Sequence, residues 1–155
     1  MDERSRRKFC RPGLFGILAL LASCDPPSVA VRDAWVRATG PDQTSTAMYL
    51  TIENSGGADR LTSVALPQGG EATLHFGTNA GGIARMRPMS EGLEIASGSE
   101  IQLRPGGDHV MIMGLAGPLR EGDAVPVVLH FEKAGDRQIA ARVEAADADS
   151  RSAGR

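Results

Sequence analysis

Short segments of alternating polar and apolar residues run along most of the chain with a period of two. From His109 to Met113, Val110 and Ile112 face one side of an extended backbone, while His109, Met111 and Met113 face the other. Eight more segments alternate in the same way or carry β-branched residues, and turn residues separate nearly all of them. The predicted strands are 29–38, 46–54, 61–66, 71–76, 93–95, 101–103, 109–113, 125–131 and 138–143.

The turn composition supports the same fold class. The 155 residues include 19 Gly and 9 Pro, and no segment shows a convincing helical period. We therefore expect one all-β domain, an antiparallel β-sandwich, over residues 29–144. Residues 145–155 have little apolar surface to bury, and we expect them to be disordered.

Residues 1–23 have the composition of an export signal. A basic start precedes the apolar run 13–22, which is too short to span a bilayer. The run ends in Leu-Ala-Ser-Cys, which resembles a bacterial lipobox and makes Cys24 the lipidated first residue of the mature protein. Residues 5–9 also resemble a twin-arginine signal, and a buried N-terminal helix is the alternative. We expect a lipid-anchored protein on the periplasmic face of the cell membrane, with 24–28 as a proline-stiffened tether.

Charge and cysteine usage exclude several functions. Without residues 1–23, which carry five basic and two acidic residues, the net charge falls from −2 to about −5. The arginines are dispersed, so nucleic-acid binding is not expected. With Cys10 removed and Cys24 lipidated, no thiol remains for a disulfide or a nucleophile. The sequence also shows no catalytic triad, carboxylate pair or phosphate-binding glycine motif, so we expect that the protein is not an enzyme.

Histidine and methionine gather in one part of the chain. Two of the 3 His and four of the 6 Met lie between His75 and Met113. His109 and Met111 share a face of their predicted strand. His75, at the end of another strand, and Met86, from the loop that follows, can complete a set of four neutral donors. We interpret these four residues as a metal site.

The donor types select the metal. Thioether sulfur is a soft, uncharged donor that holds Cu(I) well and binds Zn, Mg or Ca poorly, while imidazole raises the affinity. Cu(II) prefers a harder tetragonal set, and a blue-copper site needs a cysteine thiolate that the mature domain lacks. Cu(I) is therefore the expected cargo. Met89 and Met113 are possible auxiliary donors, although packing is the more ordinary role of a strand methionine, as for Met48.

Five sequence blocks carry a family resemblance. They are Ala34 to Ala38, Ala47 to Leu50, Ile52 to Asn54, Met86-Arg87-Pro88 and Leu103 to Leu115. Together they resemble the periplasmic copper chaperones of the PCuAC type. The resemblance implies a cupredoxin-like (immunoglobulin-like) β-sandwich with His75, Met86, His109 and Met111 at the ligand positions. It also implies delivery of Cu(I) to cytochrome c oxidase or its assembly factors. In many relatives a further methionine follows the first histidine, where this chain has Phe76-Gly77.

Alternatives remain open at this level. A copper-sequestering envelope lipoprotein would use the same donors, and a metal-free sandwich lipoprotein could use its methionines to bind proteins. Arg87 and Asp108, next to predicted ligands, either orient them or are ordinary surface charges. His130 is expected to be hydrogen-bonded and to lie outside the motif.

Overall fold

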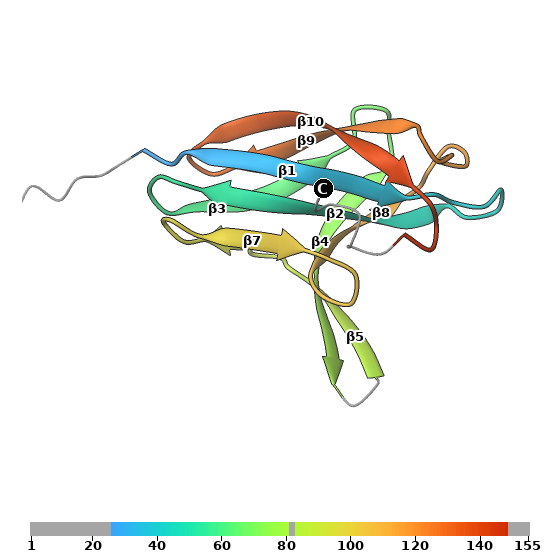
Figure 1. Cartoon of the computed structure of the whole chain (residues 1–155), viewed down its shortest axis with the longest axis horizontal. Coiled ribbons are helices and arrows are strands. Elements are labelled where there is room, and N and C mark those ends of the chain that lie inside the picture. The colour runs from blue at the N-terminus through green and yellow to red at the C-terminus, as the bar shows by residue number, and fades with distance from the viewer. Residues whose placement is uncertain (1–25, 81–82, 149–155) are drawn as a thin grey trace, which may run out of the picture.

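The computed structural model describes residues 26–80 and 83–148. The predicted leader, the predicted lipidation site Cys24 and residues 149–155 lie outside this range. No helix that could cross a membrane occurs among the described residues. They form ten strands (Figure 1): β1 (Val29–Arg37), β2 (Ser45–Asn54), β3 (Asp59–Ala65), β4 (Glu71–Ala80), β5 (Ile83–Pro88), β6 (Leu93–Ile95), β7 (Glu100–Leu103), β8 (His109–Met113), β9 (Ala124–Phe131) and β10 (Gly135–Glu144).

Hydrogen bonds join these strands into one curled sheet. Its order is β5-β4-β8-β2-β1-β10-β9-β3-β6, with β7 paired to β2 off this path. All neighbours are antiparallel except β1 and β10, whose parallel pairing makes the sheet mixed. β2 pairs first with β8 and then, from Leu50 onward, with β7. The all-β sandwich class predicted from the sequence is confirmed, with one parallel pair that the residue pattern did not indicate.

The apolar face of each strand forms the core. Val110 and Ile112 of β8 and Met48 of β2 are fully buried, as the alternation in their segments predicts. Burial alternates along β9 in the same way. The register that buries Val110 and Ile112 turns His109, Met111 and Met113 to the opposite face, because successive side chains of a strand point to opposite sides.

The strand β5 was missed by the sequence analysis, which placed Met86 in a loop. β5 forms a hairpin with β4, and β4 continues to Ala80 rather than ending near 76. Residues 85–88 are all exposed, and Met86 between two arginines is too short an alternation to indicate a strand, so it is the pairing with β4 that makes this segment extended. We call His75–Ala80 and Ile83–Pro88 the arm, because in Figure 1 this hairpin projects from the body.

Both ends of the described chain are held by hydrogen bonds. The Gly57 N–H donates to the Pro26 carbonyl, and the Ser55 N–H donates to the Ser28 carbonyl. At the other end, the Arg37 guanidinium donates to the Ala146 carbonyl at 2.8 Å. The last residues of the predicted tether therefore lie against a turn of the body, and the first residues of the predicted tail have a defined contact.

Candidate metal centre

The strand register brings the four predicted donors onto one face of the sheet. His75 of β4 lies directly opposite His109 of β8. On the other side of β4, Gly77 lies opposite Met86 of β5. Directly paired residues point to the same face, and residues two apart on one strand do so too. His75, Met86, His109 and Met111 therefore share the face opposite the core.

The two imidazoles stack on each other and are oriented by backbone carbonyls. Their ring centroids are 5.8 Å apart with an interplanar angle of 11°. Nδ1 of His109 lies 2.9 Å from the Gly107 carbonyl oxygen, and Nδ1 of His75 lies 3.1 Å from that of Thr73. A carbonyl oxygen can only accept, so each Nδ1 donates its proton in the neutral ring. Each Nε2 then keeps its lone pair for a metal.

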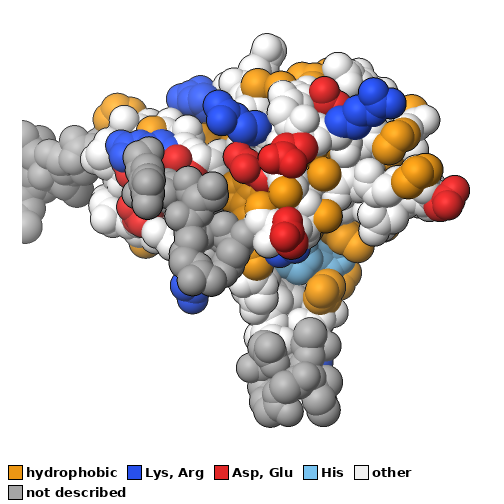
Figure 2. Space-filling view, turned by 45° about the vertical axis from the view of Figure 1, so that its right-hand side comes forward, with side chains coloured by type: hydrophobic (Ala, Val, Ile, Leu, Met, Phe, Trp, Pro, Cys, Tyr) orange, Lys and Arg blue, Asp and Glu red, His pale blue; other side chains and the backbone are white. Residues whose placement is uncertain are grey.

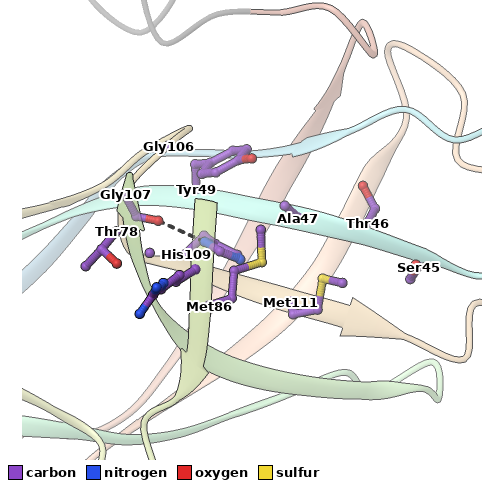
Figure 3. Close-up of a pocket in the computed structure, with 12 residues that line it drawn as sticks. Ser45, Thr46, Ala47, Tyr49, Thr78, Met86, Gly106, Gly107, His109 and Met111 are labelled. Carbon is purple, nitrogen blue, oxygen red and sulfur yellow. Dashed lines mark hydrogen bonds between the residues drawn. The ribbon is translucent and has the colours of Figure 1, made fainter. Parts of the chain in front are cut away.

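A groove of about 280 Å³ opens on this face and is lined by Met86, His109 and Met111. Figure 3 shows these three side chains next to one another, below the ring of Tyr49. His75 does not line the groove and reaches the site through its stacking on His109. The remaining lining residues are Ser45, Thr46, Ala47, Gly77, Thr78, Arg85, Gly106 and Gly107.

The donors differ in how far solvent reaches them. The exposed fraction of His109 is 6%, whereas that of Met86 is 60%, and Met111 lies between. The two possible auxiliary donors are placed differently. Met89 packs into the hydrophobic core, away from the groove. Met113 is on the same face as Met111 but beyond the residues that line the groove.

Asp108 ties the arm to the turn before β8. Its Oδ1 accepts the backbone N–H of Gly77 at 3.1 Å. The approach is so close that a Cβ added to Gly77 would lie 2.0 Å from the Gly107 carbonyl oxygen, which requires glycine there. Asp108 therefore holds the arm against the turn through this hydrogen bond, and Arg87 is exposed.

Tyr49 is a wall of the groove that the sequence analysis did not assign to the site. Its ring centroid is 6.4 Å from that of His109 and 4.5 Å from that of Trp35. The Arg37 Nε donates to the Tyr49 hydroxyl at 3.3 Å, and its guanidinium carbon lies 5.6 Å from the ring centroid. The alternation along β2 could have indicated this position, because it places Tyr49 on the same face as Ala47, which pairs with Met111.

Harder metal sites are not evident in the described part of the chain. No group of three or more His, Cys, Asp or Glu that could hold a metal ion occurs there. His130, predicted to lie outside the motif, is hydrogen-bonded through Nδ1 to Asp136 at 2.7 Å. The predicted donors that line the groove, two thioethers and one imidazole, are soft or borderline.

Comparisons with known proteins agree with this architecture. The family model described as "Putative lipoprotein LpqE-like" matches residues 29–143. The chain is 32% identical over 117 residues to the "Putative lipoprotein Lxx21020" of Leifsonia xyli subsp. xyli (strain CTCB07), covering 75% of this chain and 69% of that protein.

Solved structures share the fold. The copper-bound PCuAC domain from PmoF2 has a TM-score of 0.63 at 26% identity, over 76% of this chain and 92% of that one. The Cu(I) form of DR1885 from Deinococcus radiodurans has a TM-score of 0.62 at 30% identity, over 84% and 85%. These likenesses confirm the resemblance to PCuAC domains. The chain belongs to the LpqE-like family, and its domain has the PCuAC fold.

Proposed function

We propose that this protein binds one Cu(I) ion and carries it to an acceptor protein in the bacterial envelope. The observation that carries the proposal is the groove, where thioethers of Met86 and Met111 meet His109, whose Nδ1 proton is committed to a carbonyl. His75, oriented in the same way, stacks on His109 and supplies the fourth donor.

The donor chemistry suits a monovalent soft ion. All four donors are neutral, so a single positive charge is held without the desolvation cost of burying carboxylates beside it. A divalent hard ion would find no oxygen anion among them. The relatives named as a copper-bound PCuAC domain and as Cu(I) DR1885 support copper as the cargo.

A carrier must release its ion as well as bind it. Met86 lies on the exposed arm, where an incoming donor can replace its sulfur while His109 and Met111 still hold the copper. This stepwise exchange needs no general acid, base or nucleophile. By resemblance to PCuAC-type chaperones, we propose cytochrome c oxidase or one of its assembly factors as the acceptor.

The site of action follows from the predicted N-terminus. Lipid on Cys24 would hold the domain at the periplasmic face of the membrane, with residues 24–28 as the link. The lipoprotein descriptions of the family and of the Leifsonia relative support this placement. Replacement of Cys24 by Ser is then expected to release the protein from the membrane fraction.

Cu(I) titration under reducing conditions, in competition with a chromogenic chelator, tests the function. Met86→Leu and Met111→Leu should each lower the affinity at least about tenfold with under about 1.5 kcal/mol lost in unfolding free energy. Leucine nearly conserves volume and lacks the donor atom. Met113→Leu is the matched control and should bind like the parent.

The outcome also separates the alternatives. A parent protein that binds no Cu(I) would leave only the metal-free protein-binding sandwich. A protein that binds Cu(I) tightly but releases it to no acceptor would be a sequestering lipoprotein. If both leucine variants bound like the parent, the groove would not be the copper site.

A further inference from the structure

The arm is the part of the described molecule where large apolar side chains meet solvent. Among the described residues, the exposed large hydrophobic side chains are Phe76, at 49%, and Met86, at 60%. Both belong to the arm. Isolated exposed apolar residues are ordinary, but two on one projecting hairpin beside a ligand groove indicate a surface that meets a partner.

The arm also differs from the body in charge. From His75 to Pro88 it carries two arginines, Arg85 and Arg87, and no aspartate or glutamate. Residues 26–148 as a whole hold ten lysines and arginines against fifteen aspartates and glutamates. A positive arm on a negative body orients an approaching acidic protein toward the arm and repels it elsewhere.

The pairing of β4 with β5 places the exposed aromatic side chain and the two arginines close together. Phe76 pairs directly with Arg87, and Thr78 pairs with Arg85, so the exposed aromatic ring and both guanidinium groups share one face of the hairpin. Thr78 and Arg85 also line the groove together with Met86. In Figure 2 the histidine surface and neighbouring apolar side chains lie where the arm leaves the body. Met86 pairs with Gly77 and therefore points to the opposite face of the hairpin, so a partner reaches both guanidinium groups and the exchangeable sulfur by packing around the edge strand β5.

We infer that the arm is the docking element for an acidic surface on the protein that receives copper, an inference that rests on the proposed function. Carboxylates of the acceptor pair with Arg85 and Arg87, and an apolar residue of the acceptor covers Phe76. An acceptor that packs around the edge strand β5 also brings a thioether or imidazole to Met86, the most exposed predicted donor.

Transfer to two synthetic peptides tests this docking. Both peptides contain the same two methionines and one histidine, flanked by glutamates in one and by lysines in the other. The Cu(I)-loaded full chain is mixed with each, and the copper left on the protein is measured at timed intervals after rapid separation. At low salt the glutamate peptide should remove copper about tenfold faster or more, and 1 M salt should abolish the difference, because the Debye length is then about 3 Å.

Charge variants localise the effect. Arg87→Glu should reverse the preference for the glutamate peptide and Arg87→Gln should reduce it, with equilibrium Cu(I) affinity unchanged in both. Arg120→Glu, an equal charge change on an exposed loop, should leave most of the preference. Equal rates for the two peptides with the parent protein, or equal effects of Arg120→Glu and Arg87→Glu, would overturn the inference.

Two further outcomes are distinguishable. If the parent binds no Cu(I) in the chelator titration, the proposed function fails before docking is tested. If the arm instead binds phosphatidylglycerol vesicles in an Arg87-dependent way while the peptides show equal rates, the partner is a membrane surface and the inference of an acidic acceptor is wrong.

Discussion

The β8 strand and the arm contribute to the same groove but are built in opposite ways. β8 lies between β2 and β4, with Val110 and Ile112 fully buried beneath His109 and Met111. The arm ends in the edge strand β5, whose residues 85–88 are exposed. Core packing fixes the β8 donors, whereas Met86, the donor on β5, is held by one strand pairing and by the hydrogen bond between Asp108 and Gly77. A site divided in this way can hold an ion with one half and exchange a donor on the other.

Methionine occurs both in the core and on the arm, so truncating one methionine in each place tests the difference between the two regions most strongly. Met48→Ala should cost about 2 to 5 kcal/mol of unfolding free energy, because Met48 is fully buried and its loss leaves a cavity. Met86→Ala should change the unfolding free energy by less than about 0.5 kcal/mol, because its side chain is largely exposed. Denaturant unfolding of the apo proteins measures both. A large loss in Met86→Ala would mean that the arm is part of the folded core.

The two histidines should also contribute unequally to Cu(I) affinity, with the larger contribution from His109 of β8. His109→Ala should lower Cu(I) affinity about a hundredfold, since it removes a donor held in the groove by the Gly107 carbonyl. His75→Ala should lower it less, because His75 does not line the groove and acts beside His109. Chelator competition gives both affinities. Equal losses would place the two imidazoles symmetrically around the ion.

Asp59 does not line the groove and provides a control for effects on stability that should leave Cu(I) binding unchanged. Asp59 is buried and accepts backbone N–H bonds from Arg60, Lys133 and Ala134. Burial raises the pKa of Asp59, but these hydrogen bonds and the nearby Lys133 charge outweigh it and lower the pKa below its ordinary value. A lowered folded-state pKa stabilises the fold above the ordinary aspartate range, and this stability is lost as pH falls through the folded value.

Asp59→Asn should therefore destabilise the protein by about 1 to 3 kcal/mol at pH 7, because an amide cannot accept all three bonds. The difference from the parent should shrink as the pH falls from about 5 toward 3. Thermal midpoints across this range measure it, and Cu(I) affinity at pH 7 should be unchanged. A midpoint difference independent of pH would show that the carboxylate charge is not what stabilises this turn.

The smallest expected effect concerns the contact between the arm and the turn before β8. Asp108→Ala removes the acceptor for the Gly77 N–H and should lower Cu(I) affinity by a few fold, because Met86 is then less well positioned. Asp108→Asn keeps an acceptor oxygen and should restore most of the affinity. If asparagine behaved like alanine, the negative charge of Asp108, and not its hydrogen bond, would matter to the ion.

The sequence by itself determined the all-β class, most strand positions and the grouping of the donors. Period-two alternation states which face of β8 is buried, so His109 and Met111 had to share the other face. The thioether and imidazole donors predict a preference for Cu(I), and copper binding at these residues stays a prediction. The strand β5 could not be predicted in this way, because residues 85–88 are exposed on both faces and bury no apolar side that a longer alternation would mark.

Tertiary structure decided what depends on pairing between distant segments. The register of β4 against β8 stacks His75 on His109, and the pairing of β5 with β4 places Met86 on a strand. Met89, just after β5, packs into the core. Tyr49 enters the groove wall because β2 lies beside β8. A local pattern reports which side of its own strand a residue occupies, whereas hydrogen bonding between strands decides which side chains meet across it.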